Sequence, residues 1–138
     1  MIIPCDLLYN IYMLNRHEYR ERLMFVLYQH LLLQKDLNVC FINTFEDDDN
    51  EFINKIINDI NINENTYIEK ISQYLKNWTF DRLNYVEQAI LLLATSEINQ
   101  ALNDKSVVID EAIILSKEYC DETSYKYING VLDNICNN

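Results

Sequence analysis

A cluster of basic residues near the start of the chain could contact phosphate. Arg16, Arg20 and Arg22 are three of the four arginines in 138 residues, and they fall within seven positions. Guanidinium groups pair with phosphate oxygens, so the cluster indicates a local contact with RNA. The net charge of −11 argues against a general nucleic-acid binder and favours an acidic body that also meets a basic partner. The plainer alternative is a set of arginines that solvate a surface.

Other motifs that could carry chemistry are incomplete. HEYRE, from His17 to Glu21, resembles the start of a zinc-protease motif, but Glu21 stands where a second histidine is needed. We expect the other histidine, His30, to be a hydrogen-bonded or half-exposed helix residue. The acidic run at 46–51 lacks the glycine of a calcium loop. A single glycine excludes phosphate loops and nucleophile elbows. We therefore expect no catalytic residue, no metal site, no cofactor and no enzyme activity.

Cysteine usage and hydropathy predict a cytoplasmic protein. The four cysteines, at positions 5, 40, 120 and 136, form no CxxC pair, which suits reduced thiols better than disulfides. No apolar run approaches the ~20 residues of a membrane span. No basic segment precedes the apolar stretch LLYNIYML, so we expect neither a signal peptide nor a membrane partner.

The elements that must position these residues are helices. One glycine and one proline are too few for the turns of a β-sandwich or barrel. Apolar residues recur at spacings of three and four in seven segments, namely 16–33, 37–45, 51–60, 66–75, 80–102, 107–119 and 124–135. Segment 80–102 is the most apolar, so we expect it to be central. Thr79 and Ser106 are the predicted N-caps of the fifth and sixth segments.

The single glycine, Gly130, falls inside the last predicted helix. Glycine costs about 1 kcal/mol relative to alanine in a helix interior. We favour the hypothesis that Gly130 lets the backbone of a neighbouring helix come close, with Ala112 and Ser116 as the facing surface. The alternative is a tolerated glycine on the surface.

Four segments together resemble the NusB family of bacterial transcription antitermination factors. NWTFDRLNYVEQAILLLATSEI, SVVIDEAIILSKEY and SYKYINGVLDNI stand in the order and spacing of the family's C-terminal half. RHEYRERLMFVLYQHLL is similar to the family's first helix, with Arg20-Glu21 followed by Leu27-Tyr28. The resemblance covers about residues 15–135.

The resemblance implies an all-α fold of about seven helices in two packed helical subdomains, at about 15–76 and 77–138. Residues 1–14 would then be an N-terminal extension, either an added turn of helix or a misassigned start. The family has no enzyme activity. Its members pair with the ribosomal protein NusE and bind the boxA element of nascent RNA, which supports ribosomal RNA transcription and reaches the RNA polymerase elongation complex indirectly. The alternative is a protein-interaction module or homodimer with little RNA binding.

The resemblance also implies positions for the contacts. The RNA-binding residues would be Arg16, His17, Arg20, Lys126, Tyr127 and Asn129, with Lys105 added on charge alone. Tyr28 and Glu87 match positions at the NusE interface. The alternatives are boundary or helix-packing tyrosines and an exposed acid.

Two further expectations follow from the resemblance. Trp78 and Arg82 match a segment that we expect to be structural, with Trp78 as a packed anchor between subdomains. Glu18 interrupts the basic motif, so NusE would supply much of the positive charge. For RNA to follow one track, the Arg16 end of the first helix and the Lys126 end of the last must lie close together.

Overall fold

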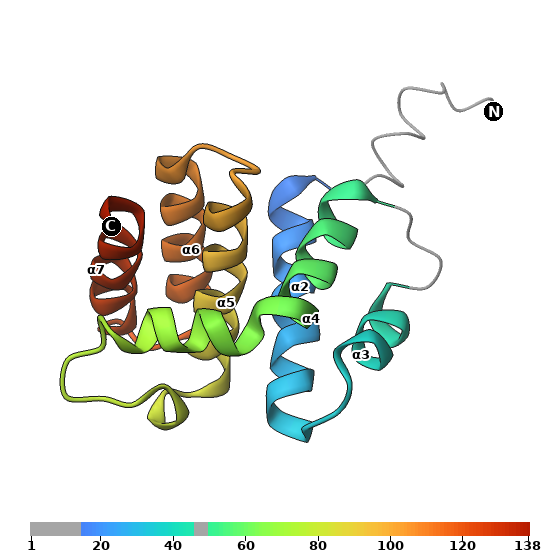
Figure 1. Cartoon of the computed structure of the whole chain (residues 1–138), viewed down its shortest axis with the longest axis horizontal. Helices are drawn as coiled ribbons and strands as arrows, with labels where there is room; N and C mark the ends of the chain where they lie inside the picture. Colours follow the sequence, from blue (N-terminus) through green and yellow to red (C-terminus); the bar gives the residue numbers. More distant parts are fainter. Residues whose placement is uncertain (1–14, 46–49) are drawn as a thin grey trace.

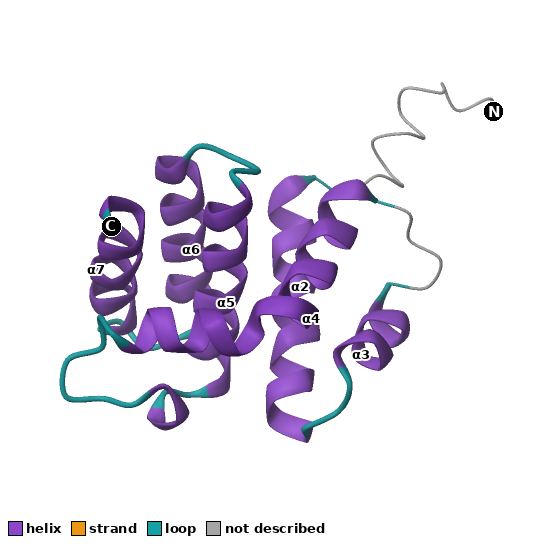
Figure 2. Ribbon diagram, in the orientation of Figure 1, coloured by secondary structure: helices purple, strands orange, loops and turns teal. Residues whose placement is uncertain are grey.

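The computed structural model describes residues 15–45 and 50–138, and within them it is all-α (Figures 1 and 2). Its elements are α2 (Arg16–Leu33), α3 (Leu37–Thr44), α4 (Glu51–Ser72), the 3-10 turn η1 (Phe80–Arg82), α5 (Tyr85–Gln100), α6 (Lys105–Tyr119) and α7 (Ser124–Asn137). This confirms the predicted fold class. The expected N-terminal extension lies outside the described residues, as does most of the acidic run.

Helix α5 is the centre of the fold. It packs against α2, α4, α6 and α7, while α3 packs on α2 at the outer edge (Figure 1). Every residue of α5 from Glu87 to Ile98 is buried, which confirms the expectation from its apolar composition. One hydrophobic core includes residues from both halves of the chain. The division into subdomains at about residue 76 therefore stays a prediction.

Helix α4 is continuous where the sequence predicted two helices. Its buried stripe, which includes Ile56 and Ile60, continues through Tyr67 to Ile71. Asp59 holds the middle of the helix, because its carboxylate accepts hydrogen bonds from Asn63 Nδ2 at 2.9 Å and Tyr67 Oη at 2.6 Å. The intervening polar residues, NINEN, contain no glycine or proline to end the helix.

The starts of α5 and α6 differ from the predictions. Thr79 precedes only η1, and Asn84 is the N-cap of α5. Asn84 Oδ1 accepts from the backbone N–H of Glu87 at 2.8 Å, and Asn84 Nδ2 donates to Glu87 Oε1 at 2.8 Å. This reciprocal pairing resembles a capping box. Helix α6 begins with Lys105 after Asp104, so Ser106 lies inside it.

Candidate nucleic-acid interface

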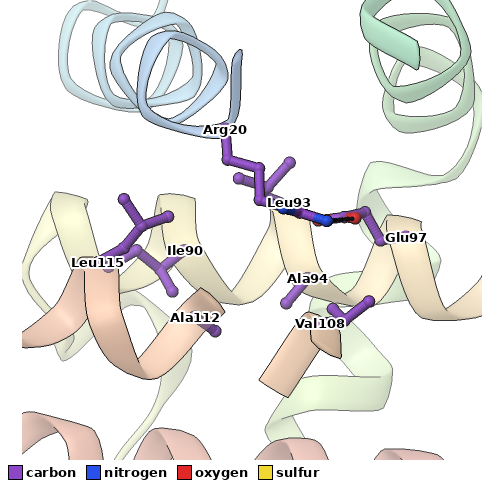
Figure 3. Close-up of a pocket in the computed structure, with 8 residues that line it drawn as sticks. All are labelled: Arg20, Ile90, Leu93, Ala94, Glu97, Val108, Ala112 and Leu115. Atoms are coloured by element: carbon purple, nitrogen blue, oxygen red, sulfur yellow. Dashed lines mark hydrogen bonds and ion pairs between the residues drawn. The ribbon is translucent and has the colours of Figure 1, made fainter. Parts of the chain in front are cut away.

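Arg20 is a buried structural residue. Its side chain is 3% exposed, and its Nε and Nη2 donate to Glu97 Oε2 and Oε1 at 2.9 and 2.8 Å. Apolar side chains of α5 and α6 surround the pair, and the space beside it is about 10 Å³ (Figure 3). The fork-to-fork geometry joins α2 to α5. The expected RNA contact at Arg20 needs correction, because its guanidinium is shielded from solvent and neutralised by Glu97.

Arg16 and Arg22 remain on the surface, and we call them the Arg16 patch. Both are exposed. The guanidinium carbon of Arg16 lies 4.0 Å from the centroid of the Phe52 ring, and that of Arg22 lies 5.9 Å from the centroid of the Phe45 ring. A cation–π contact orients the guanidinium without neutralising it. The patch can therefore present positive charge to a phosphate.

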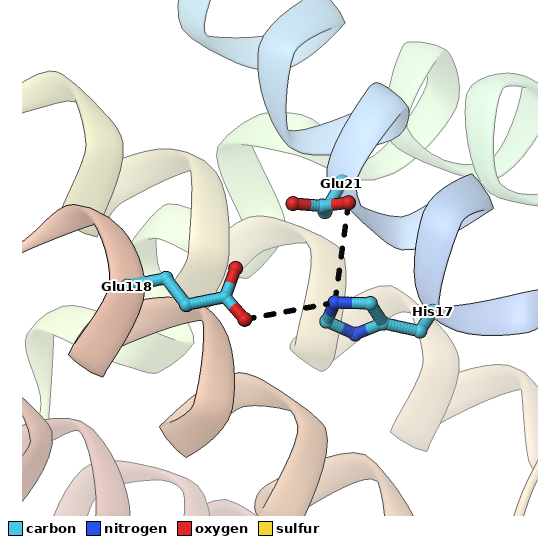
Figure 4. Close-up of side chains that lie close together, drawn as sticks. All are labelled: His17, Glu21 and Glu118. Atoms are coloured by element: carbon cyan, nitrogen blue, oxygen red, sulfur yellow. Dashed lines mark ion pairs between the residues drawn. The ribbon is translucent and has the colours of Figure 1, made fainter.

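His17 is enclosed by acids. Its Nδ1 lies 3.0 Å from Glu111 Oε2, and its Nε2 lies 3.9 and 3.8 Å from Glu21 and Glu118 (Figure 4). The hydrogen bond to Glu111 raises the pKa of His17 against the opposing effect of burial. Three carboxylates around one imidazole leave a negative environment. As it stands, the cluster repels phosphate, and this counts against His17 as a direct RNA ligand.

Glu87 is an internal acceptor rather than an exposed docking acid. It is 8% exposed. Ser124 Oγ donates to Glu87 Oε1 at 2.8 Å, and the Tyr127 hydroxyl donates to Glu87 Oε2. Burial and this hydrogen bond raise the pKa of Tyr127 far above its usual range. Glu87 thus joins the start of α5 to the start of α7, and a partner can reach it only by breaking these bonds.

The other expected contact residues have varied surroundings. Lys126 is exposed, and Asn129 is half-buried. Tyr28 is half-buried and packs against the core, so part of it is accessible to a partner. Lys105 Nζ donates to the backbone carbonyl of Cys136 at 2.9 Å, which places a cation at the C-terminal end of α7.

A groove between α7 and the segment that follows α4 was not predicted. Its volume is about 300 Å³, and we call it the Tyr127 groove. It is lined by Tyr74, Leu75, Lys76, Trp78, Tyr127, Gly130, Val131 and Asn134. The lining residues come from two segments, 74–78 and 127–134, that are about fifty positions apart, and this is why sequence spacing could not reveal the groove.

Two residues of the Tyr127 groove correct the sequence analysis. Trp78 is 60% exposed, so it is not a packed anchor. A Cβ atom added to Gly130 would meet nothing within 4 Å. The predicted close packing of Gly130 against Ala112 and Ser116 is therefore wrong. The glycine instead leaves open space along the groove.

The Arg16 patch on α2 and the Lys126 end of α7 do not form one continuous surface for RNA. Helix α2 packs on α5, and α7 packs on α5 and α6. In Figure 1 the first turn of α2, which begins at Arg16, is at the top of the view, whereas the first turn of α7, which begins at Ser124, is at the bottom. Two interhelical steps of 8–10 Å, by way of α5, put the axes of α2 and α7 up to about 20 Å apart. RNA that contacts both surfaces must cross the intervening helices.

Comparison with known proteins gives the family. The model of the NusB family matches residues 13–137. The chain belongs to the NusB family. A transcription antitermination protein NusB from Staphylococcus aureus (strain JH9) is 37% identical over 127 residues, which cover 88% of this chain and 98% of that protein. The resemblance found in the sequence is confirmed.

Solved NusB structures agree with this assignment. T. maritima NusB superposes with a TM-score of 0.83 at 32% identity, covering 90% of this chain and 92% of that one. A structure of the antitermination factors NusB and NusE in complex with dsRNA matches with a TM-score of 0.78 at 26% identity, covering 88% and 96%. Within residues 15–45 and 50–138, none of the helices is long and apolar enough to cross a membrane.

Proposed function

We propose that this NusB-family protein is a transcription antitermination factor that binds boxA RNA together with the ribosomal protein NusE. The observation that carries the proposal is the family match over residues 13–137. A relative named transcription antitermination protein NusB, alignable over 98% of its length, supports it. The similar structure that contains NusB, NusE and dsRNA supports the choice of partners. The protein acts in the cytoplasm on ribosomal RNA transcription, without enzyme activity and with the RNA polymerase elongation complex as an indirect partner.

Two surfaces supply the RNA contacts in this proposal. At the Arg16 patch, exposed guanidinium groups bind phosphate. At the Tyr127 groove, the exposed indole of Trp78 offers a stacking platform to an unpaired base, and Lys126 lies one residue from Tyr127. Asn129 and Lys105 are secondary polar contacts. Arg20 and Glu87 act indirectly, because they hold α2 and α7 against α5.

A titration of boxA-like RNA, with and without NusE, tests the proposal. We expect tight binding with NusE and weaker binding without it. Arg16→Ala should make the slope of log affinity against log salt shallower by about 0.7, the value for one lost phosphate contact on a single strand. Lys35→Ala removes the same charge from an exposed position beyond the other end of α2, and it should leave the slope unchanged.

The two outcomes that count against the proposal are separable. Absence of RNA binding at low salt, even with NusE, would overturn the function. An Arg16→Ala slope equal to that of the unsubstituted protein would overturn only the role of the Arg16 patch.

A second candidate function is a protein-interaction module, including a homodimer. Exposed apolar side chains gather at the end of α2 and on α3, where Leu33 is 52% exposed, Val39 47% and Ile42 63%. Exposed apolar surface of this kind favours a protein contact. Light scattering of the protein alone and with NusE distinguishes the two: a stable homodimer that excludes NusE and RNA supports the second candidate.

A further inference from the structure

Three side chains near the start of α2 converge on one point. His17 and Glu21 are one helical turn apart on α2, and Glu118 reaches them from the last turn of α6 (Figure 4). One donor atom from each, the imidazole Nε2 and two carboxylate oxygens, lies within 4.8 Å of the others. The side chains are 30%, 26% and 44% exposed, so the point is open to solvent on one side.

The distances do not fit a hydrogen-bonded cluster. Nε2 lies 3.9 Å from Glu21 Oε1 and 3.8 Å from Glu118 Oε1, and both separations exceed a hydrogen bond. A protonated imidazole that served only to neutralise these acids would donate from Nε2 at about 2.8 Å. The three donor atoms lie within 4.8 Å of one another, and we call the space between them the gap.

The other nitrogen of His17 is already engaged. Its Nδ1 lies 3.0 Å from Glu111 Oε2. When Nδ1 carries the proton and donates it to Glu111, Nε2 presents its lone pair to the gap. A carboxylate behind a histidine, on the side away from the metal, is the usual second shell of a metal site. The Tyr119 hydroxyl likewise donates to Glu21 Oε2, which fixes the carboxylate whose other oxygen faces the gap.

We propose that His17, Glu21 and Glu118 bind one divalent transition-metal cation, with Glu111 as a positioning residue. One imidazole and two carboxylates suit Mn²⁺ or Zn²⁺, and the remaining coordination positions face water. Donors bound to one ion at about 2.1 Å lie about 3.0–3.5 Å apart. The two observed separations from His17 Nε2, 3.9 and 3.8 Å, therefore need to shrink by about 0.5 Å when the ion binds. This site differs from the sequence expectation of no metal site. That expectation rested on the histidine spacing within one helix, whereas Glu118 comes from another helix.

The test is calorimetric titration of MnCl₂ into the full chain near pH 7.5. Mn²⁺ is the first probe because it prefers oxygen and nitrogen ligands, whereas Zn²⁺ also binds free thiols, which this chain contains. We expect saturable binding of one ion per chain. Glu118→Gln should weaken the affinity at least tenfold. Glu122→Gln removes the same charge from an exposed position outside the cluster and should change it less than twofold.

A second readout locates the ion. Glu118 is exposed, so its replacement by the isosteric glutamine leaves the fold intact. Paramagnetic broadening by substoichiometric Mn²⁺ should affect the His17 imidazole first, and less so in Glu118→Gln. The proposal is overturned by an absence of saturable heat, by equal affinities of Glu118→Gln and Glu122→Gln, or by broadening centred on other acids. None of these outcomes depends on RNA or NusE, so the metal-site proposal is tested independently of the proposed function.

Discussion

Replacing Gly130 with alanine should stabilise the protein. Gly130 lies in the interior of α7, it is exposed, and its φ angle is not positive. An added Cβ meets nothing within 4 Å, so the substitution creates no clash. Alanine also restricts the unfolded chain and favours the helix, and together these effects are worth about 0.5–1 kcal/mol.

The corresponding shift in melting temperature is measurable. Unfolding entropy of about 2.1 cal/mol/K per residue gives roughly 290 cal/mol/K for the 138 residues. A gain of 0.5–1 kcal/mol then raises Tm by about 2–3 °C. Calorimetry or far-ultraviolet circular dichroism of Gly130→Ala resolves this difference. A lower Tm would refute the reasoning, because it would show that another backbone packs against Gly130.

A larger side chain at the same position tests the Tyr127 groove. Gly130→Leu keeps a strong helix former but fills part of the groove. If an unpaired base stacks there, RNA affinity should fall at least fivefold, since one stacking contact is worth about 1–3 kcal/mol. The control is Asn137→Leu, an exposed and uncharged position of α7 that does not line the groove. Equal RNA affinities for the two leucine variants would contradict base binding in the groove.

Two further predictions concern ionic contacts. Glu97→Gln leaves the buried guanidinium of Arg20 without its main partner. The free energy of unfolding, measured in urea, should fall by about 3–5 kcal/mol. A loss below about 1 kcal/mol would show that Arg20 is not buried in solution. A hydrogen bond to Glu64 raises the pKa of His30 above 6.5, so its contribution to stability is complete below that pH and declines as pH rises through the folded-state pKa. His30→Gln should therefore be more destabilising near pH 6 than near pH 9, and a pH-independent difference would contradict the pairing.

The fold could be predicted from the sequence because helix periodicity is local. Apolar spacing located the helices, and the apolar composition of segment 80–102 identified the central one. The errors arose where short-range signals were ambiguous. The polar run 61–65 suggested a break in α4, but the hydrogen bonds of Asp59 to Asn63 and Tyr67 bridge it. The apolar pattern of this segment begins before Asn84, in what is η1, so apolar spacing alone places the start of α5 too early.

The site was harder to predict because its chemistry depends on long-range pairing. Arg20 is followed by an acidic neighbour in sequence, yet its partner is Glu97, 77 positions away. The sequence signal for this pair is Glu97 itself, because a carboxylate within the most apolar helix needs a buried cation as a partner. Glu118 approaches His17 from α6. The spacing of residues within one helix could not predict this contact either.

The ion pairs that Arg20 and His17 form within the protein limit how strongly the protein can bind RNA by itself. Arg20 is neutralised by Glu97 and His17 is surrounded by acids, which leaves Arg16, Arg22, Lys76 and Lys126 as exposed cations of the two proposed surfaces. Four phosphate contacts on a single strand give a salt slope of about −3, so affinity falls only about 50-fold between 50 and 200 mM salt. Proteins with six to ten contacts lose 10³–10⁵ over the same interval. If a basic ribosomal partner supplies the missing cations, the complex must show a clearly steeper slope than this chain alone. Equal slopes would mean that NusE acts by ordering the RNA or this protein, and not by adding charge.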